Sequence, residues 1–99
     1  MRLTKQQIGI IKELATEVFG ENAVVTLFGS RTDSKGKGGD IDIMVTTEEP
    51  VERPALMAAR LSARISRELE GQQVDVVIDA PSLKRLPIHD IAETTGIRL

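Results

Sequence analysis

The segment that decides the fold is FGSRTDSKGKGGDIDIMV, residues Phe28–Val45. A hydrophobic run ends at Gly29-Ser30, a loop rich in glycine and lysine follows, and two aspartates then stand one residue apart at the head of an alternating apolar run. Alternate residues of a β-strand share a face, so Asp40 and Asp42 are predicted to lie on one face with Cα atoms roughly 6.5–7 Å apart. Two carboxylates so close repel each other unless a cation or a shared proton lies between them.

Helical and strand patterns flank this segment on both sides. Thr4 and Gln7 have the spacing of a capping box, and apolar residues then recur at helical spacing until Gly20. Runs of β-branched residues and alternating patterns indicate strands. The predicted elements are helices over 5–19, 55–69 and 87–95, and strands over 22–28, 40–46 and 72–79.

The order of these elements predicts an α/β (α+β) fold built on a small mixed β-sheet. A helix separates the second and third strands, which favours a right-handed crossover and parallel pairing, whereas the first two strands are placed to form a hairpin. The helices are expected to pack mainly on one face of the sheet. The length of 99 residues fits a single domain over 1–99.

Composition excludes several classes of function. The net charge of −2 argues against general nucleic-acid binding, and Phe19 and Phe28 are the only aromatic residues available for base stacking. The sequence contains no cysteine, and its one histidine, His89, is interpreted as a helix-end surface residue. No signal peptide or run of about 18 apolar residues is present, so no membrane association is expected and the expected compartment is the cytoplasm.

A third aspartate and the Gly-Ser turn complete a candidate site. Asp75 interrupts the apolar run VDVV and would join the other carboxylates if its strand neighbours theirs. Clustered carboxylate oxygens favour Mg²⁺ or Mn²⁺. Gly29 permits a positive φ and a close ligand approach, and Ser30 offers a hydroxyl and backbone N–H groups to an anion. Phosphate on the turn and metal on the carboxylates together suggest phosphoryl or nucleotidyl transfer.

The combination of Phe28-Gly29-Ser30-Arg31, Gly39-Asp40-Ile41-Asp42-Ile43 and a lone Asp75 in a hydrophobic strand resembles the minimal nucleotidyltransferases (MNT) of the DNA polymerase β superfamily. The resemblance covers most of the chain and implies a palm-like nucleotidyltransferase fold. The metal and catalytic residues that it implies are Asp40, Asp42 and Asp75, which would bind two Mg²⁺ ions, with Mn²⁺ as an alternative. The nucleotide-binding residues that it implies are Gly29, Ser30, Arg31 and Gly39.

The resemblance also implies a reaction and a partner. A nucleoside monophosphate, AMP from ATP in the first instance, would pass from an NTP to a hydroxyl with release of pyrophosphate, and Asp75 would help to deprotonate that hydroxyl. Minimal nucleotidyltransferases of this size are often the antitoxin of a pair whose toxin is a small helical RNase of the HEPN type. The acceptor would then be a tyrosine of that toxin, within a homo- or hetero-oligomer.

Other interpretations remain open at this level. The domain could neutralise a partner toxin by direct contact, with little catalysis, or modify a small molecule as the aminoglycoside nucleotidyltransferases do. Arg31 could pair with Asp33 or Asp90 instead of binding phosphate. The row of Arg60, Arg64 and Arg67 on the second long helix is most simply a solvated face. The nucleotide and the acceptor are not specified by any residue that stands out.

Overall fold

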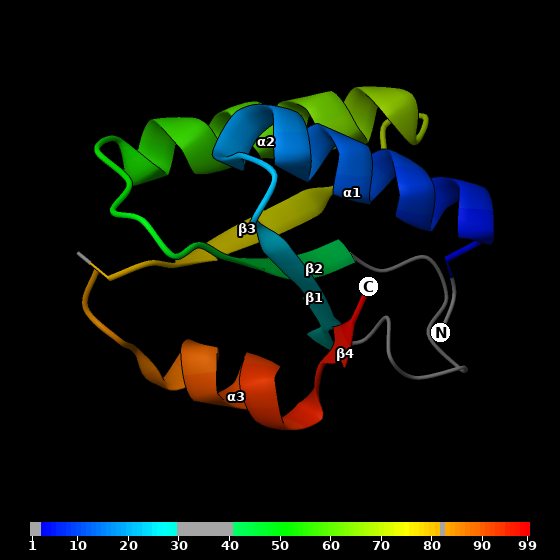
Figure 1. The fold of residues 1–99 in the computed structure, drawn as a ribbon. Coiled ribbons are helices and arrows are strands. Elements are labelled where there is room, and N and C mark those ends of the chain that lie inside the picture. Colours follow the sequence, from blue (N-terminus) through cyan, green and yellow to red (C-terminus); the bar gives the residue numbers. More distant parts are fainter. Residues whose placement is uncertain (1–2, 30–40, 82) are drawn as a thin grey trace.

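The computed structural model describes residues 3–29, 41–81 and 83–99, and its elements follow the predicted order closely (Figure 1). Each helix and strand lies within two residues of its predicted bounds, apart from a short final strand that the sequence did not predict. The elements are α1 (Lys5–Phe19), β1 (Val24–Phe28), β2 (Ile41–Thr46), α2 (Pro54–Glu68), β3 (Val74–Asp79), α3 (Pro87–Thr95) and β4 (Ile97–Arg98).

The capping box predicted at the start of α1 is present. The Thr4 hydroxyl accepts a hydrogen bond from the Gln7 backbone N–H at 3.1 Å, and the Gln7 side-chain oxygen accepts from the Thr4 N–H at 2.9 Å. The helix ends at Gly20, whose φ of 102° is a conformation that glycine adopts without strain. Local chemistry therefore accounts for both ends of α1.

The strands form one sheet in the order β3-β2-β1-β4. β1 and β2 pair antiparallel, while β2 and β3 pair parallel across the α2 crossover, so the predicted mixed sheet is confirmed. β4 pairs antiparallel with β1, with Ile97 opposite Leu27. Two residues are too few to produce a recognisable alternating pattern, and for this reason the sequence did not reveal β4.

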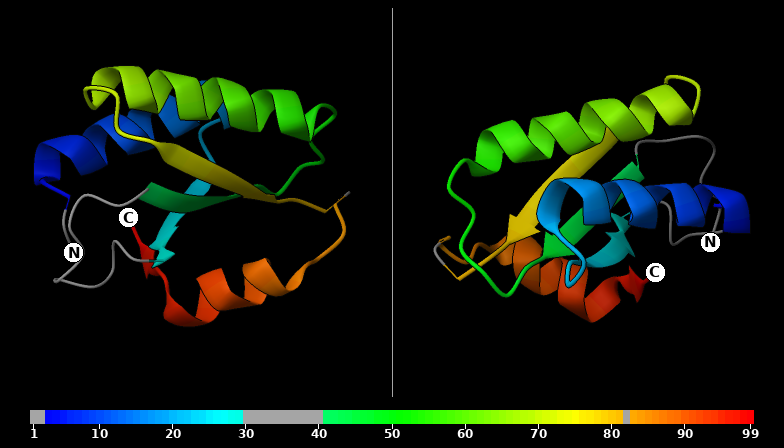
Figure 2. Two further views of the ribbon diagram at one scale, coloured as in Figure 1. Left: turned by 180° about the vertical axis from the view of Figure 1, so that it is seen from behind. Right: turned by 45° about the horizontal axis from the view of Figure 1, so that its top comes forward.

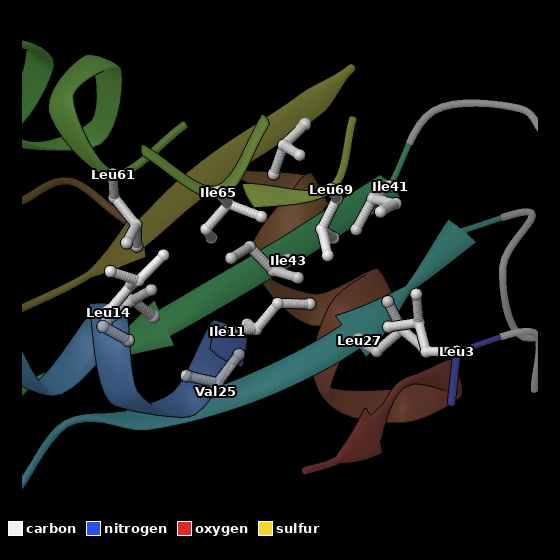
Figure 3. Close-up of a cluster of buried hydrophobic side chains, with 13 residues drawn as sticks. Leu3, Ile11, Leu14, Val25, Leu27, Ile41, Ile43, Leu61, Ile65 and Leu69 are labelled. Carbon is white, nitrogen blue, oxygen red and sulfur yellow. The ribbon is translucent and has the colours of Figure 1, made fainter. Parts of the chain in front are cut away.

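Two helices cover one face of the sheet and one helix covers the other, which agrees with helices mainly on one face (Figures 1 and 2). Between the sheet and the pair α1 and α2 lies the main core, in which Ile11, Ile43 and Ile65 are fully buried (Figure 3). A smaller cluster of Phe28, Met44 and Ala92 lies under α3. None of the described helices is long and apolar enough to cross a membrane.

His89 lies in the interior and not on the surface, so the prediction for this residue was wrong. Its side chain is only 4% exposed, because α3 turns this side towards the sheet. Nδ1 accepts a hydrogen bond from the Leu86 N–H at 2.9 Å, and Nε2 lies 2.8 Å from the Ile78 carbonyl. These two partners assign the proton to Nε2 and satisfy the ring completely.

The outer edge of β3 is partly closed by side chains from the helices. Ile41 N–H donates to the Gln73 carbonyl, so by alternation the carbonyls of Val74 and Ile78 point away from β2. The Ser62 hydroxyl, from α2, donates to the Val74 carbonyl, and His89 binds that of Ile78. Such side-chain bonds reduce the tendency of an edge strand to pair with another chain.

Candidate functional site

Asp42 and Asp75 stand side by side on neighbouring strands. They are direct register partners in the parallel β2–β3 pair, so their Cα atoms lie about 4.8 Å apart. Asp42 is half-buried and Asp75 is exposed. The structure therefore brings together the carboxylate of the Asp-x-Asp motif and the lone carboxylate of β3, as the sequence predicted if the two strands were neighbours.

Both aspartates project from the face of the sheet on which α3 packs. Met44 and Val77, two residues further along each strand, belong to the apolar cluster beneath α3. On the opposite face of β2, Ile41 and Ile43 are buried in the main core. The strands that carry the carboxylates are thus held from both sides, while Asp75 remains open to solvent.

Gly29 lies directly against the Asp42 carboxylate. Phe28 is the register partner of Asp42 on β1, and Gly29 follows with a φ of 77°. A Cβ atom added to Gly29 would stand 2.3 Å from Oδ2 of Asp42, so close that the carboxylate would have to shift. The glycine therefore allows the turn after β1 and the carboxylate to occupy the same small volume.

Four of the predicted site residues lie outside the described residues, namely Ser30, Arg31, Gly39 and Asp40. Among the residues that the structure does describe, no group of three or more Asp, Glu, His or Cys side chains could hold a metal ion. The described part of the site thus consists of two facing carboxylates and the glycine turn.

A magnesium or manganese ion fits the donor set that is present. Hard divalent cations take carboxylate oxygens, and Mg²⁺ is commonly held by one or two carboxylates together with substrate phosphates. Asp42 and Asp75 supply two carboxylates at one position of the sheet, and the exposure of Asp75 leaves access for a ligand. Two facing negative charges also favour a cation between them.

The far end of β3 carries an ion-pair cluster that the sequence did not reveal. Arg85 contacts Asp90 at 2.9 Å, Glu93 at 2.5 Å and Asp79 at 3.5 Å. The hydrogen bond to Asp90 is the main cause that raises the pKa of Arg85 above its usual value, and the charges of Glu93 and Asp79 act in the same direction. The cluster and His89 both join α3 to the end of β3, away from Asp75.

The comparison with family models assigns the chain to a class. The model described as nucleotidyltransferase domain matches residues 5–95, so the chain belongs to the nucleotidyltransferase domain family. The match includes the glycine turn, both described carboxylates and the three helices. No curated protein sequence matches the chain.

Three solved structures of toxin–antitoxin complexes contain a chain with the same fold. One is the complex of a tri-AMPylated HEPN toxin of Shewanella oneidensis with MNT antitoxin. The matched chain of that complex has a TM-score of 0.68 and 18% identity, and the match covers 97% of this chain and 71% of the matched chain. A MntA toxin–antitoxin mutant has a TM-score of 0.69 and 16% identity over 97% and 72%. A toxin–antitoxin complex with AMP-PNP has a TM-score of 0.65 and 17% identity over 97% and 72%.

Proposed function

We propose that the protein is a Mg²⁺-dependent nucleotidyltransferase that transfers AMP from ATP to a hydroxyl of a partner protein. The observation that carries this proposal is the Asp42–Asp75 pair, side by side on neighbouring strands, with Asp42 against the Gly29 turn, within a nucleotidyltransferase domain. We propose further that the partner is a HEPN-type toxin and that this chain is its antitoxin. Residues 1–99 would act as one domain, in the cytoplasm, within a homo- or hetero-oligomer.

Each residue of the site has a role in this proposal. Asp40, Asp42 and Asp75 would hold the Mg²⁺ ions, and the bound metal would neutralise phosphate charge and lower the pKa of the attacking hydroxyl. Gly29 and Ser30 would hold the triphosphate through backbone N–H groups. Arg31 and Gly39 would contact the nucleotide from the loop between β1 and β2.

The proposed reaction needs only ATP and the acceptor hydroxyl as reactants. The hydroxyl oxygen of the acceptor forms a bond to the α-phosphorus of ATP, and the bond from that phosphorus to the leaving oxygen breaks. Pyrophosphate departs, and the proton of the hydroxyl passes to the exposed carboxylate of Asp75. The position of Asp75 on a strand packed against α2 limits its movement, which favours alignment with the acceptor.

The molecules present in the structural neighbours support the choice of donor and partner. One neighbour is described with a HEPN toxin that carries three AMP groups, and another with the ATP analogue AMP-PNP. A third carries two aspartate-to-glutamate substitutions two positions apart, which is the spacing of Asp40 and Asp42 here. These are properties of the neighbours, and we extend them to this chain as a proposal.

Transfer of label from α-phosphate-labelled ATP to the partner tests the proposal. Asp42→Asn should abolish transfer while the fold survives, because the substitution keeps the shape of the side chain and removes one of two facing charges. Asp79→Asn is the matched control, since Asp79 lies on the same face of β3 but belongs to the Arg85 cluster. Full metal-dependent transfer by folded Asp42→Asn would contradict the proposal. A variant without transfer that still neutralises the partner would support inhibition by direct contact instead.

A further inference from the structure

A hollow lies at the opposite end of the sheet from Asp42. It has a volume of about 590 Å³ and is bounded by the end of α1, the turn that leads to β1, and residues 47–53 between β2 and α2. In Figure 1 this last segment is the green loop at the left of the molecule. Thr47 follows Asp42 by five residues along an extended strand, so the hollow begins roughly 16 Å from the carboxylate site.

Four apolar side chains line the hollow, and together they are called its floor. Val18 and Phe19 contribute from the end of α1, Val51 from the loop, and Met57 from the first turns of α2. Each of these side chains is only half-buried, so apolar surface stays accessible within the hollow. The volume falls within the range of about 300–1,000 Å³ that is usual for binding sites. The hollow is therefore large enough to receive side chains of another molecule.

The rim of the hollow is acidic. Four exposed glutamates, Glu21, Glu48, Glu49 and Glu52, stand around it, whereas Arg53 is the one basic residue in the lining. The ion pairs found among the described residues involve none of these four glutamates. Their charges add to a negative potential over a low-dielectric floor, and this arrangement attracts cations and repels phosphates.

We propose that this hollow docks a basic amphipathic segment of a partner protein. An apolar side chain of the segment would occupy the floor on Phe19 and Met57, and its lysine or arginine residues would contact the glutamates of the rim. The charge of the rim matches a basic occupant, and the apolar floor distinguishes that occupant from a simple cation. This inference does not depend on the nucleotide chemistry, because the two sites are at opposite ends of β2.

A lysine–leucine peptide with apolar residues at helical spacing is a suitable probe. Calorimetry should detect binding to the full chain, and NMR should show shifts at the amides of Val51 and Met57. The double variant Glu49→Lys/Glu52→Lys should weaken binding at least tenfold. Thr47 donates to the backbone carbonyl of Glu49 and not to its side chain, so the local turn should survive the substitution.

A matched control separates local contacts from overall charge. Glu13→Lys/Glu68→Lys changes the net charge equally at exposed positions outside the hollow and should leave binding within about threefold of the original. Met57→Gln should also weaken binding of the peptide, since this substitution makes the floor more polar without changing the net charge. Reduced binding by Met57→Gln with a normal thermal unfolding curve would support the proposal.

Three outcomes would overturn this inference. The first is an equal loss of peptide affinity in both double variants, which would mean that binding depends only on the net charge of the protein. The second is equally tight binding of a peptide with serine in place of leucine, or of spermidine, which would mean that the floor takes no part. The third is no binding of the lysine–leucine peptide at all. Mg²⁺–ATP binding, measured in the same samples, reports on the carboxylate site separately and should be unchanged in Glu49→Lys/Glu52→Lys.

Discussion

Replacement of Gly29 by alanine should disable the carboxylate site far more than it destabilises the fold. The added Cβ would lie 2.3 Å from Oδ2 of Asp42, whereas ordinary contact begins at 3.4 Å, so the carboxylate must retreat by about 1.1 Å. A displacement of this size at a reacting group can reduce a rate by about 100-fold. We therefore expect Gly29→Ala to lower label transfer by about two orders of magnitude and to weaken Mn²⁺ binding.

The cost to stability can be measured with a matched glycine. Gly29 has a φ of 77°, and alanine in that conformation costs about 1–2 kcal/mol. Gly71 has a φ of 84°, and an added Cβ there would meet nothing within 4 Å. Gly71→Ala thus carries the same backbone cost, and the same gain from a less flexible unfolded chain, without the clash. Any difference between the two variants reports on the contact with Asp42.

The assay combines three measurements on both variants: thermal unfolding, Mn²⁺ titration followed by electron paramagnetic resonance, and transfer of label from ATP. A loss of 1–2 kcal/mol should lower Tm by roughly 4–16 °C for a domain of this size. Gly71→Ala should show this loss with normal Mn²⁺ binding and transfer. Equal Mn²⁺ affinity and equal transfer rates in Gly29→Ala and Gly71→Ala would show that the contact between Gly29 and Asp42 does not shape the site.

Four further substitutions test the fold. His89→Phe should cost about 2–4 kcal/mol in chemical denaturation, because it leaves a buried carbonyl and an N–H without partners; an unchanged midpoint would contradict this. Gly96→Ala should destabilise the fold by about 1–3 kcal/mol, since its Cβ would meet the Ala92 carbonyl oxygen. Gly9→Ala, in open space on α1, should stabilise the fold by about 0.5–1 kcal/mol. Ile43→Ala should cost about 2–5 kcal/mol by cavity formation in the main core, and a smaller loss would show that the core collapses around it.

The pairing of β3 with β2 shows which features of the sheet could be predicted from the sequence. Alternation placed Asp42 and Met44 on one face of β2, and the helix between β2 and β3 favoured parallel pairing. Both features are local or depend on the length of a connection. The register that places Asp42 beside Asp75 depends on how Leu61 and Ile65 of α2 pack in the main core, and a local sequence pattern does not specify this packing.

His89 and Arg85 illustrate the limit of sequence reasoning. Both lie in a stretch with weak periodicity, where nothing local indicates which side of α3 faces the sheet. His89 is buried because α3 turns it towards the sheet, where its ring binds the outward carbonyl of Ile78, eleven residues earlier in the chain. Arg85 pairs with Asp90 and Glu93 of the adjacent α3, but it meets Asp79 only because α3 folds back on the end of β3.

The sequence by itself determined the order of helices and strands from α1 to α3, the ends of α1, and the residue types of the candidate site. These properties follow from short-range causes, namely capping, side-chain periodicity and the chemistry of carboxylates and glycine. Only the tertiary structure decided that Gly29 lies against Asp42, that β4 closes onto β1, and that an acidic hollow opens at the other end of the sheet. Each of these features joins segments that are distant in the chain, so it exists only once the core has packed.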